Sequence, residues 1–307
     1  MRLRLLSKRL VPAFRRSPVI SRVIRARDWL TYRYFLLKSP AAGHGFAEEL
    51  RKTNERRFCF VVAFNTPWVI DALTKGWQTY SSGMQLVVVD NSNSAAARQS
   101  IEKVCKTRGV PYFGLPRNPE RNPGRSHGIS MNWIYYNIVR PLKPEAFGFL
   151  DHDCLPIAPL DFSARMGGKT AYGLKWLSES NYMFTRAADD QGWFLWAGFC
   201  FFRFRDVDGL PLDFRGNGRI GLDTGGGNWE PIYSRLSPEH FEFAEEDGLH
   251  LHLGQVEATY EILDRAMLHV GGASYIGPST ELEYRRLFAD HIWSTYLGGT
   301  SDRLVQV

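Results

Sequence analysis

The sequence lacks the features that mark membrane-spanning and secreted proteins. Its 307 residues contain no apolar run long enough to cross a bilayer, and the longest, residues 192–204, is interrupted by Arg203. The four cysteines are far apart and form no Cys-x-x-Cys pair, which predicts buried free thiols in a reducing compartment. There is no N-x-S/T sequon and no uninterrupted apolar segment typical of a cleavable signal peptide. We therefore expect a cytoplasmic protein.

The motifs of several common enzyme classes are also missing. No G-x-G-x-x-G follows the first apolar segment, which argues against a dinucleotide-dependent oxidoreductase, and no G-x-S-x-G is present. The run Gly168-Lys169-Thr170 resembles the end of a phosphate-binding loop, but Ser163 stands where that motif needs glycine. A nucleotidyltransferase that makes sugar nucleotides would need a loop rich in Gly, Arg and Lys after the first strand, and Asn65-Thr66-Pro67 does not provide one.

The positive charge of the chain is concentrated in its first residues. Residues 1–38 hold eleven Lys and Arg and one acid, Asp28, which gives a net charge of +10, whereas the rest of the chain carries −4. The basic character of the whole chain therefore does not indicate a nucleic-acid-binding domain, and we expect no nucleic-acid partner.

Basic and apolar residues alternate at helical spacing in this segment. The apolar positions are Leu3, Leu6, Leu10 and Phe14, and residues 19–37 repeat the pattern after Pro18. A basic amphipathic helix is typical of binding to an anionic membrane surface, here the inner face of the membrane. A helix packed on the domain and an arm that binds RNA are the alternatives. Residues 39–55 are expected to be a linker with a short polar helix.

Short apolar strands alternate with helices between residues 58 and 151. The expected strands cover 58–64, 85–89, 110–113 and 147–151, and the expected helices cover 66–77, 95–108 and 126–140. Because the strands are almost continuously apolar, they indicate a parallel sheet covered by helices on both faces. We predict an α/β fold with a Rossmann-like, mostly parallel sheet in residues 51–307, preceded by a basic helical extension and linker in residues 1–50.

Two aspartates follow the last of these strands with one residue between them. In extended backbone Asp151 and Asp153 point to the same side, and carboxylates held so close repel each other unless a cation lies between them or one is protonated. The pair therefore indicates a divalent metal site, and oxygen ligands favour Mg²⁺ or Mn²⁺; a solvated turn is the alternative. Asn65 and Asp90 also stand at strand ends, where parallel sheets bind their ligands.

The second half of the domain is less regular. A strand is expected over 171–176, an aromatic strand or strand pair over 193–204, and a terminal helix over 284–296. A glycine-rich loop over 216–227 contains Asp223, and residues 250–252 form a brief alternating segment with two histidines.

Four segments, in their order along the chain, resemble a GT-A glycosyltransferase of the family-2 type. They are Val61-Val62-Ala63-Phe64-Asn65, Val87-Val88-Val89-Asp90-Asn91-Ser92, Phe149-Leu150-Asp151-His152-Asp153 and His269-Val270-Gly271-Gly272-Ala273-Ser274. The resemblance implies a GT-A fold with a nucleotide-binding half, 51–160, and an acceptor-binding half, 161–307. It also implies a nucleotide-diphosphate sugar donor, an Mg²⁺ or Mn²⁺ ion, and inverting transfer to a glycan or lipid-linked acceptor in bacterial cell-surface glycan synthesis.

The resemblance also assigns roles to individual residues. The expected nucleotide-binding residues are Asn65, Asp90, Asn91 and Asp151, with Asp90 at the base or ribose; the expected metal ligands are Asp151, Asp153 and His269, with Asp153 as the direct ligand. His250 and His252 share a face and are the alternatives to His269. His127 opens a helix, where it is either a local cap or a contact to substrate.

The catalytic base is the weakest match, because the Glu-Asp pair that the family often has in its acceptor region has no clean copy here. We expect Asp223 to be the base, since it lies in the second half of the domain and precedes glycines that let the backbone approach a ligand. A cap of a flexible loop is the alternative for Asp223, and Glu230 and Asp190 are the next candidates. The second hypothesis for the whole protein is a catalytically inactive scaffold held at the membrane surface by its basic tail.

Overall fold

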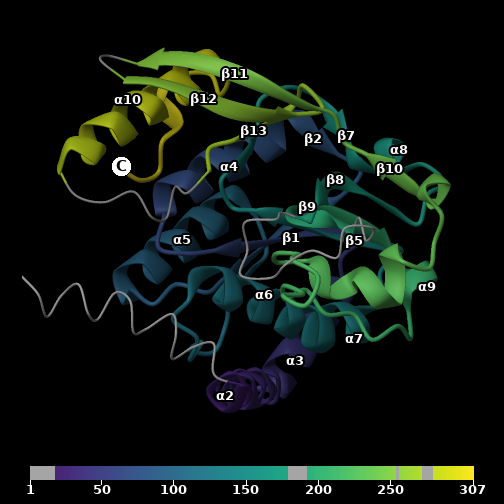
Figure 1. Ribbon diagram of the computed structural model, residues 1–307. Coiled ribbons are helices and arrows are strands. Elements are labelled where there is room, and N and C mark those ends of the chain that lie inside the picture. Colours follow the sequence, from purple (N-terminus) through teal and green to yellow (C-terminus); the bar gives the residue numbers. More distant parts are fainter. Residues whose placement is uncertain (1–17, 179–191, 254–255, 272–278) are drawn as a thin grey trace, which may run out of the picture.

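The computed structural model describes residues 18–178, 192–253, 256–271 and 279–307 (Figure 1). The helix expected over residues 3–14, Asp190, and the residues of the His269 motif after Gly271 lie outside these ranges. Among the described residues, no helix combines the length and the apolar character needed to span a bilayer. The four cysteines are buried and unpaired, as the sequence predicted.

A seven-stranded sheet forms the centre of the domain, in the order β10-β8-β9-β5-β1-β3-β4 (Figure 1). The strands are β1 (Arg57–Ala63), β3 (Gln85–Asp90), β4 (Tyr112–Gly114), β5 (Ala146–Asp151), β8 (Ala171–Leu177), β9 (Trp193–Arg203) and β10 (Phe241–Phe243). β1 pairs in parallel with β3 and β5, and β3 with β4, whereas β9 runs antiparallel to β5 and β8. The predicted α/β class with a mostly parallel sheet is confirmed.

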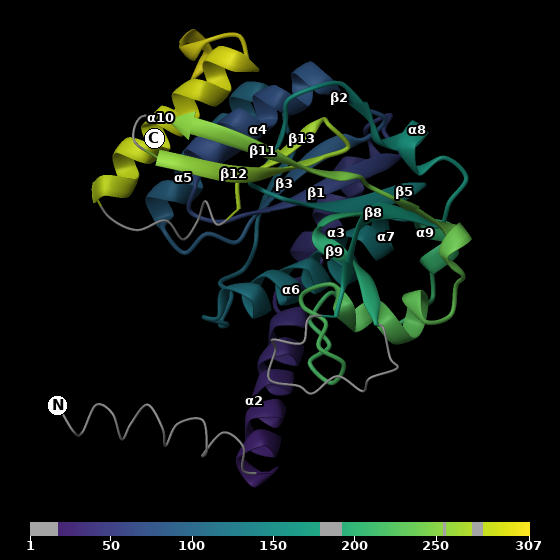
Figure 2. The same cartoon turned by 45° about the horizontal axis from the view of Figure 1, so that its top comes forward.

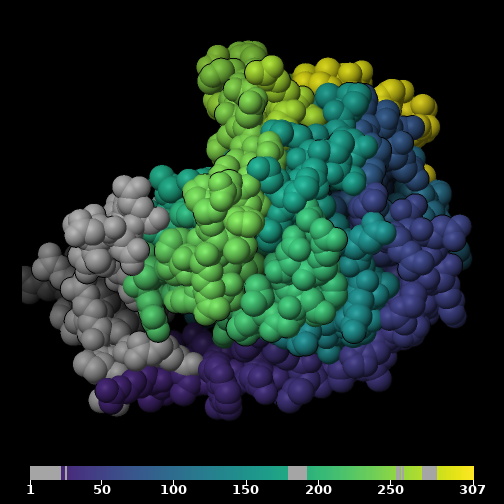
Figure 3. Space-filling model, turned by 90° about the vertical axis from the view of Figure 1, so that its right-hand side faces the viewer, coloured from purple at the N-terminus to yellow at the C-terminus, as the bar shows by residue number. Residues whose placement is uncertain are grey.

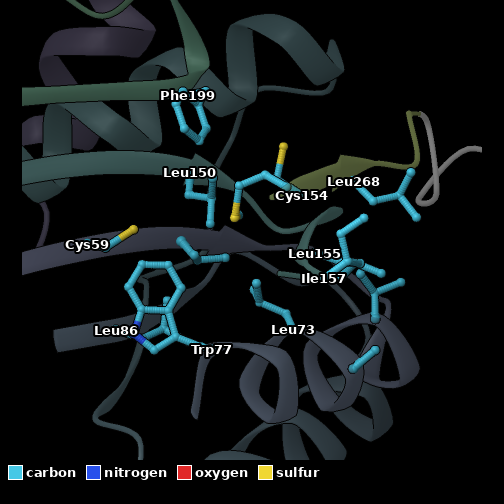
Figure 4. Close-up of a cluster of buried hydrophobic side chains, with 14 of the residues drawn as sticks. Cys59, Leu73, Trp77, Leu86, Leu150, Cys154, Leu155, Ile157, Phe199 and Leu268 are labelled. Atoms are coloured by element: carbon cyan, nitrogen blue, oxygen red, sulfur yellow. The ribbon is translucent and has the colours of Figure 1, made fainter. Parts of the chain in front are cut away.

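The side chains of β1 alternate between two cores, one on each face of the sheet. Cys59 and Val61 enter the first core, and Phe58 and Phe60 enter the second. Helices α4 (Pro67–Tyr80), α5 (Ala95–Arg108) and α10 (Ser279–Thr295) supply the first core; α3 (Pro40–Arg51), α6 (Pro123–Ile134) and α7 (Arg140–Leu142) supply the second. Figure 4 shows part of the first core, where Cys59 and Trp77 of α4 meet between sheet and helix.

A second sheet, in the order β11-β12-β13-β6, joins the first at the end of β5. Its strands are β6 (Cys154–Pro156), β11 (Glu246–Leu253), β12 (Val256–Leu263) and β13 (Met267–His269). The remaining short elements are β2 (Ser81–Ser82), β7 (Leu160–Asp161), α8 (Phe162–Met166) and α9 (Phe204–Val207). In Figure 3 the hairpin of β11 and β12, in yellow-green, stands above the body of the domain.

The first described helices pack on the domain. α2 (Pro18–Leu36) buries Tyr32 and Phe35 near its C-terminal end and projects from the body at its other end (Figure 2). α3 buries Gly43, Phe46, Ala47 and Leu50, which have the spacing of one helical face. The expectation of a linker over residues 39–55 is therefore corrected: its helix is longer and belongs to the second core, and its apolar face is hard to see in the sequence because two glycines and a proline interrupt it.

Element boundaries differ from the expected ones by a few residues. The helix expected over 95–108 coincides with α5, whereas the terminal helix begins at Ser279 instead of residue 284. The segment 193–204 forms the single strand β9, and residues 250–252 lie inside the eight-residue strand β11.

Candidate functional site

Three potential metal ligands meet where the two sheets join. Asp151 is the last residue of β5, Asp153 lies in the turn before β6, and His269 ends β13. Because β13 pairs with β6, the Val270 amide donates a hydrogen bond to the Asp153 carbonyl over 2.9 Å. One ligand atom from each of the three side chains lies within 4.8 Å of the other two. The fold thus brings together the residues expected to bind the metal.

Glu261 on the neighbouring strand fixes the ring of His269. Nδ1 of His269 donates to Oε2 of Glu261 over 2.7 Å, and Nε2 faces Oδ1 of Asp153 at 3.8 Å. Burial by itself lowers the pKa of His269, but the bond to Glu261 and the negative charges of Asp153 and Asp151 outweigh it and raise the pKa. The same hydrogen bond lowers the pKa of Glu261. A histidine held this way presents Nε2 to a cation, as metal-binding histidines do when a carboxylate holds their other nitrogen.

Trp196 packs against the His269 ring and is itself backed by a second tryptophan. The ring of Trp196 lies 4.6 Å from that of His269, centroid to centroid, and Trp196 stacks on Trp176 at 5.2 Å. Trp196 is buried. Trp196 therefore shields one side of the His269 ring from solvent.

His127 of α6 connects the metal group to a pocket. Its Nε2 lies 3.3 Å from Oδ1 of Asp151, although the two atoms are not aligned as a hydrogen bond. Asn122 caps the helix by accepting from the Arg125 amide, so the first turn that carries His127 is fixed. The structure therefore favours a site contact for His127 over a local cap, because Asn122 already serves as the cap.

The pocket lies at the carboxyl ends of β1, β3 and β5 and has a volume of about 690 Å³. Its lining is Val62, Phe64, Asn91, Ser92, Asn93, Ala95, Arg98, Arg117, Asn118, Pro119, Glu120, Arg121, Pro123, Ser126, His127 and His152. This volume is in the range of pockets that bind small molecules and cofactors, and the position is where parallel sheets bind them. Three arginines and several amides make the lining suited to an anionic, hydrogen-bonding ligand.

The residues expected to bind nucleotide differ in whether they line the pocket. Asn91 lines the pocket and donates to Ser126 Oγ over 3.0 Å. Asn65 has a φ of 54°, and its side chain bonds to Asn93 and to the Ser94 amide, so it holds the turn after β1 together and does not line the pocket. Asp151 does not line the pocket, but its Oδ1 lies 3.3 Å from Nε2 of His127, which does.

Asp90 is held at the end of β3 by hydrogen bonds within the sheet. Its side chain is fully buried, and its two carboxylate oxygens accept hydrogen bonds from the Ser92 amide and from the Tyr112 hydroxyl. Arg98 donates to the carbonyls of Ser92 and Leu115 beside it. Asp90 therefore holds the ends of β3 and β4 together, and its expected contact to a base or ribose stays a prediction.

Sequence reasoning missed Glu261 and the basic part of the pocket. Arg117, Asn118 and Arg121 come from the loop between β4 and α6, which the sequence shows only as a segment rich in Pro, Asn and Arg. The position of this loop between the end of a strand and the start of a helix could have indicated a binding role, because such loops lie at the ligand-binding edge of a parallel sheet. Glu261 had no comparable signal, since its meeting with His269 depends on the register of β12 and β13.

Asp223 lies in the glycine-rich loop, outside the metal group and the pocket lining. Its Oδ1 accepts from the Thr224 amide over 2.7 Å, and Thr224 Oγ1 donates to the Gly124 carbonyl at 3.4 Å. The loop therefore lies against the first turn of α6, close to the pocket. Gly225 has a φ of 99°, a conformation that glycine adopts without strain. The role of Asp223 as a base stays a prediction.

A half-buried ion pair lies next to this loop, whose Gly225 and Gly227 amides donate to the Phe214 and Arg215 carbonyls. Asp213 accepts from the guanidinium of Arg215 and from the side-chain amide of Asn132 on α6. The Asn132 carbonyl oxygen in turn accepts from the Phe214 amide, and Arg215 stacks over Tyr32 of α2 at 3.9 Å. Burial raises the pKa of Asp213, but the bonds and charge of Arg215 outweigh it and leave the pKa lowered.

The alternative metal ligands do not join the metal group. On β11, His250 bonds to Thr259 and His252 to Glu257, both across the hairpin. Neither histidine lies with Asp151 and Asp153 in the group that could hold an ion.

Comparison with known proteins gave matches only among solved structures. No family model matches the sequence, and no curated protein does. The fold is similar to that of solved glycosyltransferases. The mannosyltransferase PcManGT from Pyrobaculum calidifontis, in complex with GDP-Man and Mn²⁺, is 10% identical over 70% of this chain and 67% of its own, with a TM-score of 0.37. Glucosyl-3-phosphoglycerate synthase from Mycobacterium tuberculosis, in complex with Mn²⁺, UDP and glucosyl-3-phosphoglycerate, is 12% identical over 64% and 71%, with a TM-score of 0.38. The bifunctional glycosyltransferase WbbM is 10% identical over 50% of this chain, which spans only 32% of WbbM, with a TM-score of 0.35. At these identities and TM-scores the matches carry no argument about this chain, and its function is inferred from the site.

Proposed function

We propose that the protein is a metal-dependent glycosyltransferase of the GT-A type, which moves a sugar from a nucleotide-diphosphate sugar to an acceptor hydroxyl with inversion. One observation carries the proposal: the group of Asp151, Asp153 and His269 lies beside a pocket of about 690 Å³, and His127, which lines the pocket, lies 3.3 Å from Asp151 of that group. A nucleotide in the pocket would place its diphosphate toward the metal group. This is the arrangement that a diphosphate leaving group requires.

The residues present fit Mg²⁺ or Mn²⁺. Two carboxylates and one imidazole offer oxygen and nitrogen ligands, and the His269–Glu261 bond leaves Nε2 as the ligand atom. A divalent cation bound there would stabilise the negative charge that develops on the leaving diphosphate. Asp151, Asp153 and His269 would hold the cation, Glu261 and Trp196 would keep the His269 ring in place, and Asn91 with the arginine-lined loop would bind the nucleotide.

Inversion by single displacement needs a base on the side of the sugar opposite the diphosphate. We assign this role to Asp223, whose loop approaches the pocket from residues 161–307, the half we propose to bind the acceptor. The acceptor would be a glycan or a lipid-linked sugar in bacterial cell-surface glycan synthesis, and the basic residues 1–38 would hold the protein at the anionic inner face of the membrane. A catalytically inactive scaffold would have no need for three converging metal ligands and a carboxylate behind the histidine.

The test is calorimetric binding of nucleoside diphosphates and nucleotide sugars, with and without Mn²⁺. We expect binding that needs the metal and is weakened in Asp153→Asn, followed by release of the nucleoside diphosphate when donor and metal are incubated together. Glu257→Gln, an exposed carboxylate substitution on β12, is the control for a general loss of charge. Nucleotide affinity that is unchanged by excess chelator would contradict the proposal, and metal-dependent binding without any turnover would favour the scaffold.

A further inference from the structure

Helix α2 displays an unusual set of apolar side chains to solvent. Among the side chains that the structure describes, eight large apolar ones are exposed, and five of these lie on α2 or at the residue that follows it. They are Val23, Trp29, Leu30, Tyr34 and Leu37, with exposed fractions from 54% to 70%. Scattered apolar side chains are normal on a protein surface, but a concentration on one helix marks a contact surface.

Four of these side chains lie along one face of the helix. Val23, Leu30, Tyr34 and Leu37 are spaced by seven, four and three residues, the spacing of one helical face, with Leu37 just after the last residue of α2. The opposite face carries Tyr32 and Phe35, which are buried in the domain. The helix is therefore already packed through one face, and the stripe is a second apolar face directed away from the body. Figure 2 shows α2 extending beyond the domain on the side of α6.

Positive charges border the stripe. Arg27 lies on the same face between Val23 and Leu30, and Arg22 and Arg33 flank the stripe on one side, where Arg33 lies over the Trp29 ring at 5.9 Å. The one acid of the helix, Asp28, pairs with Arg27 over 2.6 Å and with Arg125 at 3.3 Å, so among the described arginines of α2 Arg22 and Arg33 carry the unpaired positive charge beside the stripe. The preceding residues 1–17 add six Lys and Arg and no acid. An apolar stripe bordered by arginines, with Trp and Tyr at its margins, is the pattern of helices that lie in the plane of a membrane interface.

We infer that the stripe of α2 inserts into the surface of an anionic bilayer, with its arginines at the lipid headgroups. Charge complementarity selects this partner. A second copy of the chain would bring arginines against arginines along the stripe. An RNA would be bound by basic side chains and would gain little from four exposed aliphatic and aromatic groups.

Helix α2 and the residue Lys38 after it are also connected to residues that line the pocket. Arg125, paired with Asp28, also bonds to Glu120, and Lys38 just after α2 donates to the Arg117 carbonyl over 3.0 Å. Glu120 and Arg117 both line the pocket. A bilayer bound to α2 would therefore lie at a fixed distance from the pocket. For this step the inference rests on the proposed function: it favours an acceptor that is itself anchored in the membrane, a lipid-linked sugar, over a soluble glycan.

The test is co-sedimentation of the full-length protein with vesicles of phosphatidylcholine, with and without phosphatidylglycerol. We expect binding to the anionic vesicles only, reduced by at least about tenfold in the double variant Leu30→Ser, Leu37→Ser, because two apolar side chains no longer insert. Arg22→Gln with Arg33→Gln should reduce binding by roughly an order of magnitude at low salt and by less at high salt. Leu282→Ser with Leu287→Ser is the matched control, since these exposed leucines lie on α10.

Several outcomes would overturn the inference. Wild-type binding in the stripe variant would place the lipid contact in residues 1–17 or elsewhere. Concentration-dependent self-association that the stripe variant abolishes, or RNA that competes with vesicles, would identify a different partner. Nucleotide binding, measured in parallel by calorimetry, separates the two proposals. An α2 variant that no longer binds vesicles but keeps metal-dependent nucleotide binding has lost only the membrane contact. A wild-type chain that binds vesicles and no nucleotide would refute the proposed function and leave the membrane contact supported.

Discussion

His269 and Glu261 face each other across β13 and β12, and Nδ1 of the histidine donates to the glutamate carboxylate over 2.7 Å. The bond selects the tautomer whose Nε2 can bind a cation, and it fixes the plane of the ring beside Asp153. Glu261 thus acts on the metal group without belonging to it. The site depends on the pairing of two strands as much as on the aspartates that mark it in the sequence.

We predict that Glu261→Gln weakens Mn²⁺ binding by roughly 10–100-fold, the usual cost of losing a carboxylate behind a histidine ligand. Glutamine keeps the size of the side chain but loses the charge that holds the imidazole. Calorimetric titration with Mn²⁺, in the presence of a nucleoside diphosphate, measures the effect. Glu257→Gln is a close control, because Glu257 pairs with His252 on the same hairpin at 3.1 Å and both are exposed. Equal losses in the two variants would show a general effect of charge.

The prediction for Asp223 concerns turnover alone. Asp223→Asn keeps the shape and the bond to the Thr224 amide but removes the basicity, so it should lower kcat by roughly 10²–10⁴-fold while donor and metal affinity stay near wild type. Turnover on the true acceptor and calorimetric donor binding measure the two quantities. Glu230→Gln is the comparison, since Glu230 is the next candidate and accepts from Asn217 at the edge of the same loop. If only the Glu230 variant is slow, the base is assigned to Glu230.

The sequence predicted the parts of the fold that are set by local pattern. Apolar strands such as β1 and β3 and the helix α5 follow from runs and periodicity within a dozen residues, and the strand-end aspartates followed from them. Asp151 and Asp153 could be placed together because extended backbone repeats every two residues. The sequence pattern therefore indicated the two aspartates of the metal group, and the resemblance added His269.

The rest of the site depends on long-range pairing. The carboxylate of Asp90 accepts a hydrogen bond from Tyr112 of β4, a contact between strands that the sequence did not predict. Glu261 contacts His269 only because of the register of β12 and β13. The apolar face of α3 is hard to recognise in the sequence because Gly43 and Gly45 interrupt the apolar pattern. No local sequence pattern indicates these long-range contacts.

His127 is predicted to support metal-dependent binding of a diphosphate. Its ring lies between the pocket and Asp151, 3.3 Å from that carboxylate. His127→Ala should weaken binding of a nucleoside diphosphate with Mn²⁺ by about 3–10-fold, the range for one polar contact, and should change nucleoside binding less. His127→Gln, which can still donate a hydrogen bond, should recover part of the loss. Equal weakening for the nucleoside and its diphosphate would show that His127 only shapes the pocket.

Asp213 is predicted to make stability depend on acid pH. Its pKa in the folded protein is lowered, since the bonds and charge of Arg215 outweigh burial, so its stabilising effect is present above the unfolded pKa of about 3.9 and is lost as the pH falls through the folded pKa. Asp213→Asn should therefore reduce the free energy of unfolding near neutral pH by about 1–3 kcal/mol, because Arg215 loses its partner, and the gap to wild type should narrow below about pH 4. Urea unfolding at the two pH values measures this. Glu145→Gln, in the exposed pair with Arg57, should cost at most about 0.5 kcal/mol. A gap that stays constant with pH would mean that the charge of Asp213 does not stabilise the fold.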